Sequence, residues 1–404
     1  MVKEKNRLKT KKDRKRNLLY RLFFSNTGEE APLLEVGGID KALLLLVLLL
    51  LSIGSIMVFS ASRAYAETHL GDANYFIRLQ SVWALLGVGV MLIASRFSPR
   101  LYRKYARLGY AVTALFLVAV LVVGSAAGGA QRWLGIGPFS FQPSELAKTM
   151  LILALAWYFS EYKEKVLLYS ERKRAFLHGT VLPSCFLLFY AVLIMLQKHL
   201  SCIIILGALT VIMLCVGGSD LKRVLLFAAP AVAGLAAFAW FTDYTQRRIL
   251  IWLNPELYPT DGGWQTLQGL MAIGSGGFFG LGFGNSRLKY SYVSEPQNDF
   301  IFTIVCEELG FVGAFLILVL FALFVWRGFM IGLHHPDHFC RLTAIGLTAK
   351  VAVQVLLNLA VITNLLPNTG ISLPFFSYGG SSLVMLMAEM GILLSISRTS
   401  LYKR

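Results

Sequence analysis

Long apolar segments recur along the whole chain and are separated by short polar ones. We predict spanning helices at residues 41–60, 79–95, 109–126, 144–160, 178–196, 200–217, 223–241, 299–326, 342–364 and 380–398. Runs of about 18 or more apolar residues are long enough to cross a hydrocarbon core as α-helix. A β-barrel would need alternating segments of about ten residues, which this pattern lacks. The sequence therefore predicts an all-α, polytopic membrane protein of about ten helices in a single bundle.

The distribution of Lys and Arg between the connecting segments sets the orientation of these spans. One set of segments holds most of them: Arg96, Arg100, Arg103, Lys104, Arg107, Lys163, Lys165, Arg172, Lys173, Arg174, Lys222, Arg223, Arg327 and Arg341. Because cytoplasmic segments carry the excess of Lys and Arg, we expect both termini to be cytoplasmic. The long segment 242–298, between the seventh and eighth spans, is then an outer loop.

This orientation divides the chain into three regions. Residues 1–40 form a basic cytoplasmic extension that we expect to be disordered, 41–398 form the membrane domain, and 399–404 form a cytoplasmic tail. The chain is 56% hydrophobic with a mean hydropathy of +0.64, which argues against an ordinary soluble domain. Much of the net charge of +16 comes from the basic extension. Such a run favours contact with anionic membrane lipid over nucleic acid.

A first polar cluster opens the fourth predicted span, at residues 141–148. Ser144 is expected to cap this helix after Pro143. Glu145 and Lys148 are three residues apart and therefore share one helix face. They are either a local ion pair at a helix start, where a Glu also suits the dipole, or functional charges at the edge of the membrane.

A second cluster covers 295–302 and continues into Glu307 and Glu308. Asp299 lies at the outer start of the eighth span, and the two glutamates lie about two turns deeper. Unpaired carboxylates at that depth are costly. They require a cationic partner, a metal ion or a water-filled cavity.

A third, uncharged cluster at 369–382 leads into the last span. Gly379, Gly380 and the serines that follow leave backbone N–H groups free at an outward-pointing helix start, which suits an anion such as phosphate. An ordinary capped re-entrant loop is the alternative.

The outer loop itself carries a fourth cluster at 254–265, with Glu256 and Asp261 near the surface. Loop carboxylates of this kind are more often solvated than catalytic. Residues 264–275 have helical periodicity, and the glycine-rich stretch 274–284 that follows indicates tight backbone turns.

Three further features are expected to be structural. Lys350 and Glu389 lie within late spans, where they can pair across helices. The histidines of 334–338 lie in a cytoplasmic segment and are weak candidates for metal binding. The five cysteines show no CxxC pair and are interpreted as small core residues.

Taken together, the first three clusters resemble the signatures of the SEDS family, the FtsW/RodA/SpoVE group of bacterial peptidoglycan polymerases. Arg132-Trp133 ahead of the first cluster, the stretch from Gly269 to Gly284, and the stretch from Asn364 to Ser382 are also similar to the family. The resemblance extends from residue 41 to 398.

The resemblance implies a glycosyltransferase of the bacterial cytoplasmic membrane that serves cell division or cell shape. Members polymerise lipid II, an undecaprenyl-pyrophosphate-linked substrate, at the outer leaflet, and they work with a class B penicillin-binding protein. A divalent cation, Mg or Mn, is thought to assist, and Asp299 and Glu308 are the candidates here to hold it, with Glu145 as a further one. The implied substrate-binding residues are Arg132, Glu145, Lys148, Gln297, Ser377, Gly379, Gly380 and Ser381. Of these, Lys148 and the helix start at Ser381 would face the pyrophosphate.

Two departures from the family pattern concern outer-face carboxylates. The family's leading catalytic Asp in the long loop aligns with Tyr258, and tyrosine is a poor base at neutral pH because its pKa is near 10. Asp261 and Glu256 are the alternative catalytic residues. A second family Asp, before the sixth span, aligns with His199.

These departures leave three functional hypotheses. The chain is an active polymerase that uses Asp261 or Glu256, or a catalytically impaired member that binds lipid II as a scaffold, or a lipid II flippase. The small number of mid-span charges disfavours the flippase.

Overall fold

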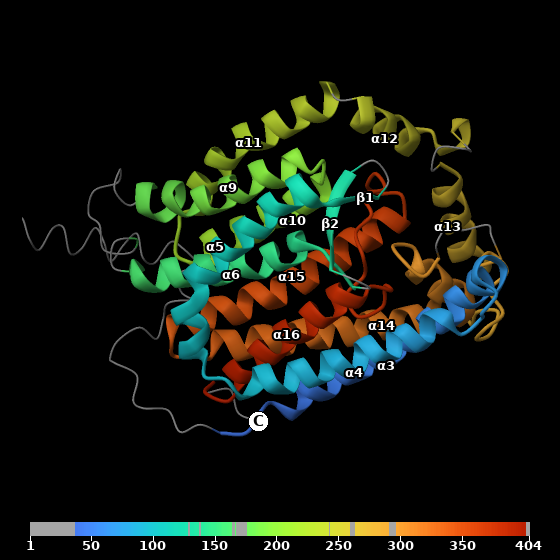
Figure 1. Cartoon of the computed structure of the whole chain (residues 1–404), viewed down its shortest axis with the longest axis horizontal. Coiled ribbons are helices and arrows are strands. Elements are labelled where there is room, and N and C mark those ends of the chain that lie inside the picture. Colours follow the sequence, from blue (N-terminus) through green and yellow to red (C-terminus); the bar gives the residue numbers. More distant parts are fainter. Residues whose placement is uncertain are drawn as a thin grey trace, which may run out of the picture.

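The computed structural model describes residues 37–127, 130–136, 139–163, 166, 176–241, 243–258, 263–290 and 296–400. Most of the basic N-terminal extension, the catalytic candidate Asp261 and the tail after residue 400 lie outside these described residues. The rest of the chain forms a bundle of long helices with a small outer cap (Figure 1).

Helices overlap all the predicted spans in the described part of the chain. They are α3 (Lys41–Leu70), α4 (Tyr75–Arg96), α5 (Pro99–Val123), α6 (Pro143–Glu161), η1 (Leu177–Val181) with α9 (Leu182–Leu196), α10 (Leu200–Val216), α11 (Leu221–Phe241), α14 (Ile301–Leu333), α15 (His338–Ile362) and α16 (Gly380–Ser397). Seven helices among the described residues are long and apolar enough to cross a membrane. The chain is therefore a multi-pass membrane protein, whereas the number ten stays a prediction.

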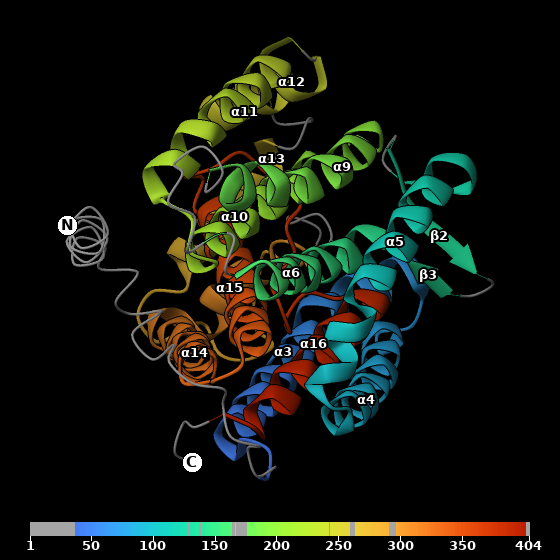
Figure 2. The ribbon, with the colours of Figure 1, turned by 90° about the vertical axis from the view of Figure 1, so that its left-hand side faces the viewer.

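The beginning of α3 and the end of α16 lie side by side (Figure 2). The Gly37 N–H donates to the Arg398 carbonyl at 2.9 Å, and the Asp40 N–H donates to the Ser397 hydroxyl at 3.0 Å. Asp40 also caps α3 through the Leu43 N–H. The first and last helices of the bundle therefore have their outer chain ends on the same side, as an even number of crossings requires.

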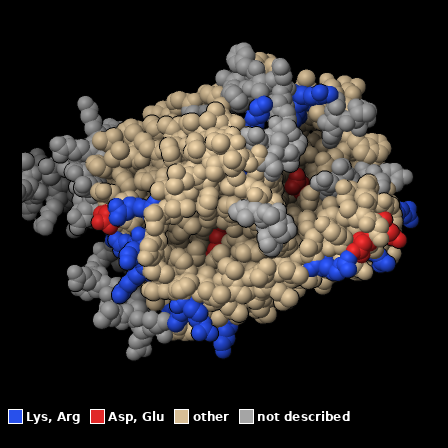
Figure 3. Space-filling model, in the orientation of Figure 1, with Lys and Arg blue, Asp and Glu red and all other residues tan. Residues whose placement is uncertain are grey.

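On the face shown in Figure 3, most charged side chains lie toward the two ends of the bundle, and the belt between them is largely uncharged, with acidic atoms visible in two hollows. This is the surface that a bilayer demands, because a charged group in the hydrocarbon region is costly.

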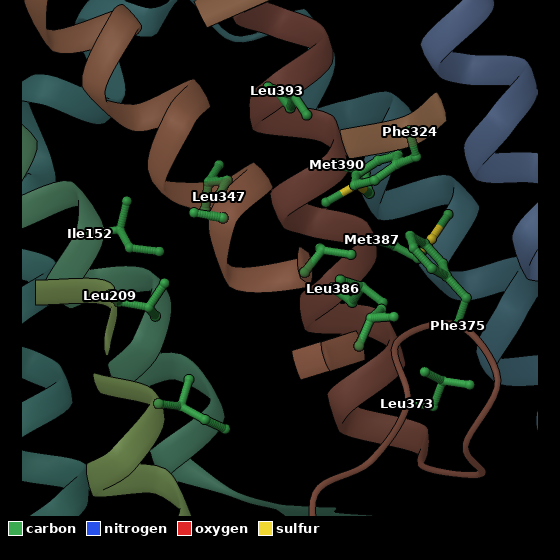
Figure 4. Close-up of a cluster of buried hydrophobic side chains, with 14 of the residues drawn as sticks. Ile152, Leu209, Phe324, Leu347, Leu373, Phe375, Leu386, Met387, Met390 and Leu393 are labelled. Carbon is green, nitrogen blue, oxygen red and sulfur yellow. The ribbon is translucent and has the colours of Figure 1, made fainter. Parts of the chain in front are cut away.

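Inside the bundle, apolar side chains from helices far apart in sequence interdigitate. Ile152 of α6, Leu209 of α10, Leu347 of α15 and Leu393 of α16 are fully buried in one cluster (Figure 4). In a membrane the lipid tails are as apolar as leucine, so close van der Waals packing, rather than escape from water, holds such helices together.

The outer cap contains elements that the hydrophobic pattern did not predict. Strands β1 (Ser125–Ala127), β2 (Ala130–Ile136) and β3 (Phe139–Phe141) form an antiparallel sheet in the order β1-β2-β3, with Leu134 opposite Phe141. The long loop contains α12 (Asp243–Leu253), the 3-10 turn η2 (Pro255–Leu257) and α13 (Gly263–Ser275). Helix α13 confirms the periodicity at 264–275, whereas α12 was not predicted.

Helix α14 is broken at Gly310, whose φ of 66° and ψ of −168° are not helical. Hydrogen bonds with the glycine-rich stretch satisfy the backbone groups on both sides of this break. Leu281 N–H donates to the Glu307 carbonyl at 3.0 Å, and Phe311 N–H donates to the Gly277 carbonyl at 2.9 Å. Non-helical backbone at membrane depth is tolerated only where protein satisfies it, and these bonds do so.

The close packing of the glycine-rich stretch against α14 predicts that two nearby glycine substitutions affect stability differently. A Cβ at Gly276 would overlap the carbonyl of Cys306, whereas one at Gly274 would meet nothing within 4 Å. We expect Gly276→Ala to destabilise the protein by about 1–3 kcal/mol through overpacking. Gly274→Ala, inside α13, is the matched control and should be neutral or slightly stabilising. Thermal unfolding in detergent measures the stability of both variants, and equal melting temperatures would contradict the close packing of Gly276 against α14.

Candidate functional site

Helix α6 begins at Pro143, which occupies its first turn and has the φ that a helix start requires. Gln142 is the N-cap residue and makes no side-chain capping bond. Ser144 is buried, and its hydroxyl has no hydrogen-bond partner among the described residues. The expectation that Ser144 caps this helix is therefore wrong, because the helix begins two residues earlier than a cap at Ser144 would require.

Glu145 and Lys148 form the expected ion pair on one face of α6. Lys148 Nζ lies 2.7 Å from the Glu145 carboxylate, and the two side chains are 3% and 14% exposed. Such a pair pays a large desolvation cost unless further groups complete its hydrogen bonds. A buried lysine with one protein partner still has donors available for a ligand.

A second buried pair lies nearer the centre of the bundle. Lys350 of α15 donates to Glu389 of α16, and the Thr149 hydroxyl of α6 donates to the same carboxylate oxygen. The expected pairing of Lys350 with Glu389 is thus confirmed. The three residues join α6, α15 and α16, the helices that surround the polar centre of the bundle.

A polar cavity lies between these helices and the loop that precedes α16. Its lining includes Glu145, Lys350, Gln354, Ser372, Ser377 and Ser382, with Leu373, Pro374, Phe375, Leu383 and Leu386 as its apolar part. The cavity has about 30 Å³ of space, enough for one or two water molecules. The structure therefore brings together Glu145 and Ser377, two residues from separate sequence clusters. Gln354 and Ser372 were not among the predicted site residues; Gln354 lies four positions after Lys350 and so shares its helix face.

The loop between α15 and α16 is held on the start of α14 by a ladder of hydrogen bonds. Ser377 Oγ donates to the Asn298 carbonyl at 2.9 Å and accepts from Leu373 N–H at 2.7 Å. Tyr378 N–H donates to the Gln297 carbonyl at 2.8 Å. The predicted substrate-binding residues Gln297 and Ser377 therefore meet here. The Ser377 hydroxyl serves the loop, whereas the buried Gln297 Oε1 has no partner among the described residues.

Helix α16 begins at Gly380, with Gly379 as its N-cap, and no side chain caps it. Gly380 is packed so tightly against Trp83 of α4 that a Cβ would overlap the indole. Gly379, Gly380 and Ser381 are all partly exposed. The open helix start predicted for an anion is therefore present.

The two metal candidates are not brought into one site. Glu308 is fully buried and accepts from Ser60 Oγ at 2.7 Å and from Lys289 Nζ at 3.0 Å. The backbone carbonyl of Asp299, about two helical turns away, accepts from Asn358 at 2.8 Å. Glu308 already has a cationic partner in Lys289, which follows the glycine-rich stretch, so its role as a metal ligand stays a prediction. Within the described ranges, no group of three His, Cys, Asp or Glu could hold a metal ion, so these residues do not fit a divalent cation.

Arg132 of β2 contacts the connection between α9 and α10, which holds His199. Arg132 donates to the Lys198 carbonyl at 2.7 Å. Burial, helped by Arg132 and Lys148, lowers the pKa of His199 from 6.5 to about 3. At neutral pH the His199 side chain is therefore an uncharged imidazole.

This shift predicts a pH-dependent contribution of His199 to stability. The unfolded chain takes up a proton at this histidine below about pH 6.5, whereas the folded protein does so only near pH 3. The stability that neutral His199 allows is thus lost progressively as the pH falls from about 6.5 toward 3. We expect His199→Asn to lose less melting temperature than the wild type between pH 7 and pH 5. Parallel curves for the two proteins would contradict the shift.

The catalytic candidates of the long loop have different positions. Glu256 in η2 is exposed and Tyr258 is half-buried, while Asp261 lies outside the described residues. Gly263 N–H donates to the Tyr258 carbonyl at 3.2 Å, so the chain on the two sides of residues 259–262 is held together.

Asn368 joins the long loop to the loop before α16. Its carbonyl accepts from Arg248 of α12 at 2.9 Å, and its amide donates to Gln265 of α13 at 3.2 Å. The segment that carries Glu256 and Tyr258 is therefore flanked by helices that are anchored to the loop before α16.

Known proteins match this chain over nearly its full length. The family model described as "Cell cycle protein", for FtsW, RodA and SpoVE, matches residues 41–402. Stage V sporulation protein E of Bacillus subtilis is 38% identical over 366 residues, covering 90% of this chain and 98% of that protein. The probable peptidoglycan glycosyltransferase FtsW of Geobacter sulfurreducens is 38% identical over 367 residues, covering 90% and 96%.

Solved structures match the fold as well. A chain from a peptidoglycan synthase complex, whose structure concerns the coordination of polymerization and crosslinking, superposes with a TM-score of 0.73 at 28% identity, covering 89% of this chain and 98% of that one. The rod shape determining protein RodA of Thermus thermophilus gives 0.66 at 28% identity, covering 90% and 98%.

Proposed function

Because the chain belongs to the FtsW/RodA/SpoVE family, we propose that it is a peptidoglycan glycosyltransferase that polymerises lipid II at the outer face of the bacterial cytoplasmic membrane. A relative named as such an enzyme matches almost end to end. The reaction serves cell division or cell-shape maintenance.

The observation that carries the proposal is the buried Glu145–Lys148 pair in a bundle where α16 also has an uncapped start. A glycosyl transfer from a lipid pyrophosphate releases that pyrophosphate as the leaving group, and its negative charge must be stabilised as the bond to the sugar breaks. The Lys148 ammonium and the N–H groups at Gly380 and Ser381 supply this stabilisation, with Arg132 at the outer rim. Glu145 keeps Lys148 in place, and Gln297 and Ser377 shape the loop.

The bond changes assign the remaining role to a base. The acceptor sugar hydroxyl attacks the anomeric carbon of the donor sugar, a new C–O bond forms, and the bond to the pyrophosphate oxygen breaks. The hydroxyl proton passes to a carboxylate, for which Asp261 and Glu256 are the candidates. Since the described residues do not fit a divalent cation, no step here is routed through one. Positive charge comes from this chain's own residues.

The proposed partners follow from the same assignment. A class B penicillin-binding protein would crosslink the strands, which is supported by the likeness to a chain from a synthase complex. The basic extension would rest on anionic lipid at the cytoplasmic face.

A scaffold that binds lipid II without polymerising it is the second candidate, favoured by Tyr258 at the family's Asp position. The purified chain, combined with its penicillin-binding protein and labelled lipid II, separates the two, with glycan strands resolved by gel electrophoresis. Polymer formation supports the enzyme. Lipid II binding without polymer, under conditions where a relative is active, supports the scaffold, and transport across vesicles without either would favour a flippase.

A further inference from the structure

The cavity between α6, α15 and α16 is electrically balanced, unlike the open start of α16. Each charged side chain in the lining is paired with a residue of opposite charge that is not part of the lining. Glu145 is paired with Lys148 at 2.7 Å, and Lys350 is paired with Glu389. Inside the cavity a phosphate would meet the Glu145 carboxylate, which would repel it, because Lys148 is not part of the lining. The cavity therefore suits an uncharged polar group.

The cavity wall carries the amide of Gln354 and the hydroxyl of Ser372. Gln354 is 4% exposed, and its side chain lines the cavity. Ser372 lines the cavity as well and is partly exposed. A buried amide left without a partner is costly, so a ligand that enters the cavity has to offer this group a hydrogen bond.

Part of the cavity lining is apolar. Leu383 and Leu386 of α16 form it together with Leu373 and Pro374 of the loop. Leu373 lies beside Leu386 in the packed cluster (Figure 4). A ligand group that fits must therefore present a donor and an acceptor together with a small apolar end.

We propose that this cavity receives the acetamido group of an amino sugar of the substrate, with Gln354 as the residue that determines specificity for it. An acetamido group has a carbonyl acceptor, an N–H donor and a methyl group. The carbonyl accepts from the Gln354 amide or the free donors of Lys350, the N–H meets Ser372 or Glu145, and the methyl packs on Leu383 and Leu386. The inference rests on the proposed function, since both sugars of peptidoglycan carry such a group.

Entry of the acetamido group displaces the one or two waters for which the cavity has room. A site built to bond a polar group rejects an analogue that lacks it, because its own buried groups are then left unpaired. Specificity at this position follows from the Gln354 amide, which lines the cavity and can hydrogen-bond a polar group placed there.

The test is a binding measurement that needs no turnover. Lipid II and two analogues, each with one acetamido group replaced by a hydroxyl, are titrated against the purified wild type. We expect one analogue to bind about tenfold more weakly, as the loss of one well-made hydrogen bond implies. Gln354→Met should bind lipid II about tenfold more weakly and lose the preference over that analogue.

Gln80→Met is the matched control. Gln80 is also a buried glutamine, but it does not line the cavity. It should keep the wild-type preference, and Ser372→Ala serves as a second cavity variant should Gln354→Met unfold. The proposal is overturned if wild type binds both analogues as tightly as lipid II, or if the cavity variants keep the wild-type ratio. Failure to make polymer would count against the proposed activity only.

Discussion

Asp261→Ala is expected to abolish glycan polymerisation by the purified protein with its partner, with a rate loss of at least about 100-fold. The family resemblance aligns Tyr258 with the leading catalytic Asp, and we expect its phenol to be a poor base because it is almost fully protonated at neutral pH. Glu256, the other candidate carboxylate of this loop, is exposed, and exposed loop carboxylates are more often solvated than catalytic. Asp261 is the candidate that we expect to take the proton.

Three companion variants make this prediction specific. Glu256→Ala should retain activity within a few-fold, lipid II binding by Asp261→Ala should be unchanged, and Tyr258→Asp should restore activity to the Asp261→Ala protein. Normal polymerisation by Asp261→Ala would refute the assignment. If Glu256→Ala is the inactive variant instead, the base is Glu256 and the exposed turn must close over the substrate.

The periodicity of apolar residues was sufficient to predict the bundle, because a spanning helix depends on little beyond its own length and hydropathy. The sheet at 125–141 was not predicted. Its strands β1 and β3 have three residues each, too short for an alternating pattern to be distinguished from a loop. Helix α12 was missed because it lies in a polar loop, where no apolar run marks it.

The site divides in the same way between local and distant relations. Glu145 and Lys148 could be paired from sequence because three residues along a helix fix their separation. The partner of Glu308 could not be predicted in this way, because Lys289 comes from a different segment. Hydrogen bonds between the backbone around Gly310 and the preceding glycine-rich stretch bring that segment close. Gln354 carries no charge and lies in an apolar helix, so only the cavity beside it draws attention to it.

Lys350→Met is expected to destabilise the protein by about 3–5 kcal/mol, the usual cost of leaving one member of a buried ion pair without its partner. Lys350 and Glu389 are 2% and 1% exposed, and Glu389 Oε2 has no partner among the described residues, so the remaining carboxylate would have only the Thr149 hydroxyl. The double variant Lys350→Met, Glu389→Leu should recover most of this loss, because apolar side chains of similar volume replace such pairs without penalty. Thermal unfolding in detergent gives the three values.

The double variant also separates the two roles of Lys350. If the ion pair only joins α15 to α16, the folded double variant should bind and polymerise lipid II as the wild type does. If Lys350 also donates to a substrate group in the cavity, the double variant should be stable yet bind lipid II more weakly, with the loss overlapping that of Gln354→Met in a double-mutant cycle. A stable double variant with full affinity would leave Gln354 as the polar contact of α15 in the cavity, and an unstable one would show that Glu389 has structural partners beyond Lys350 and Thr149.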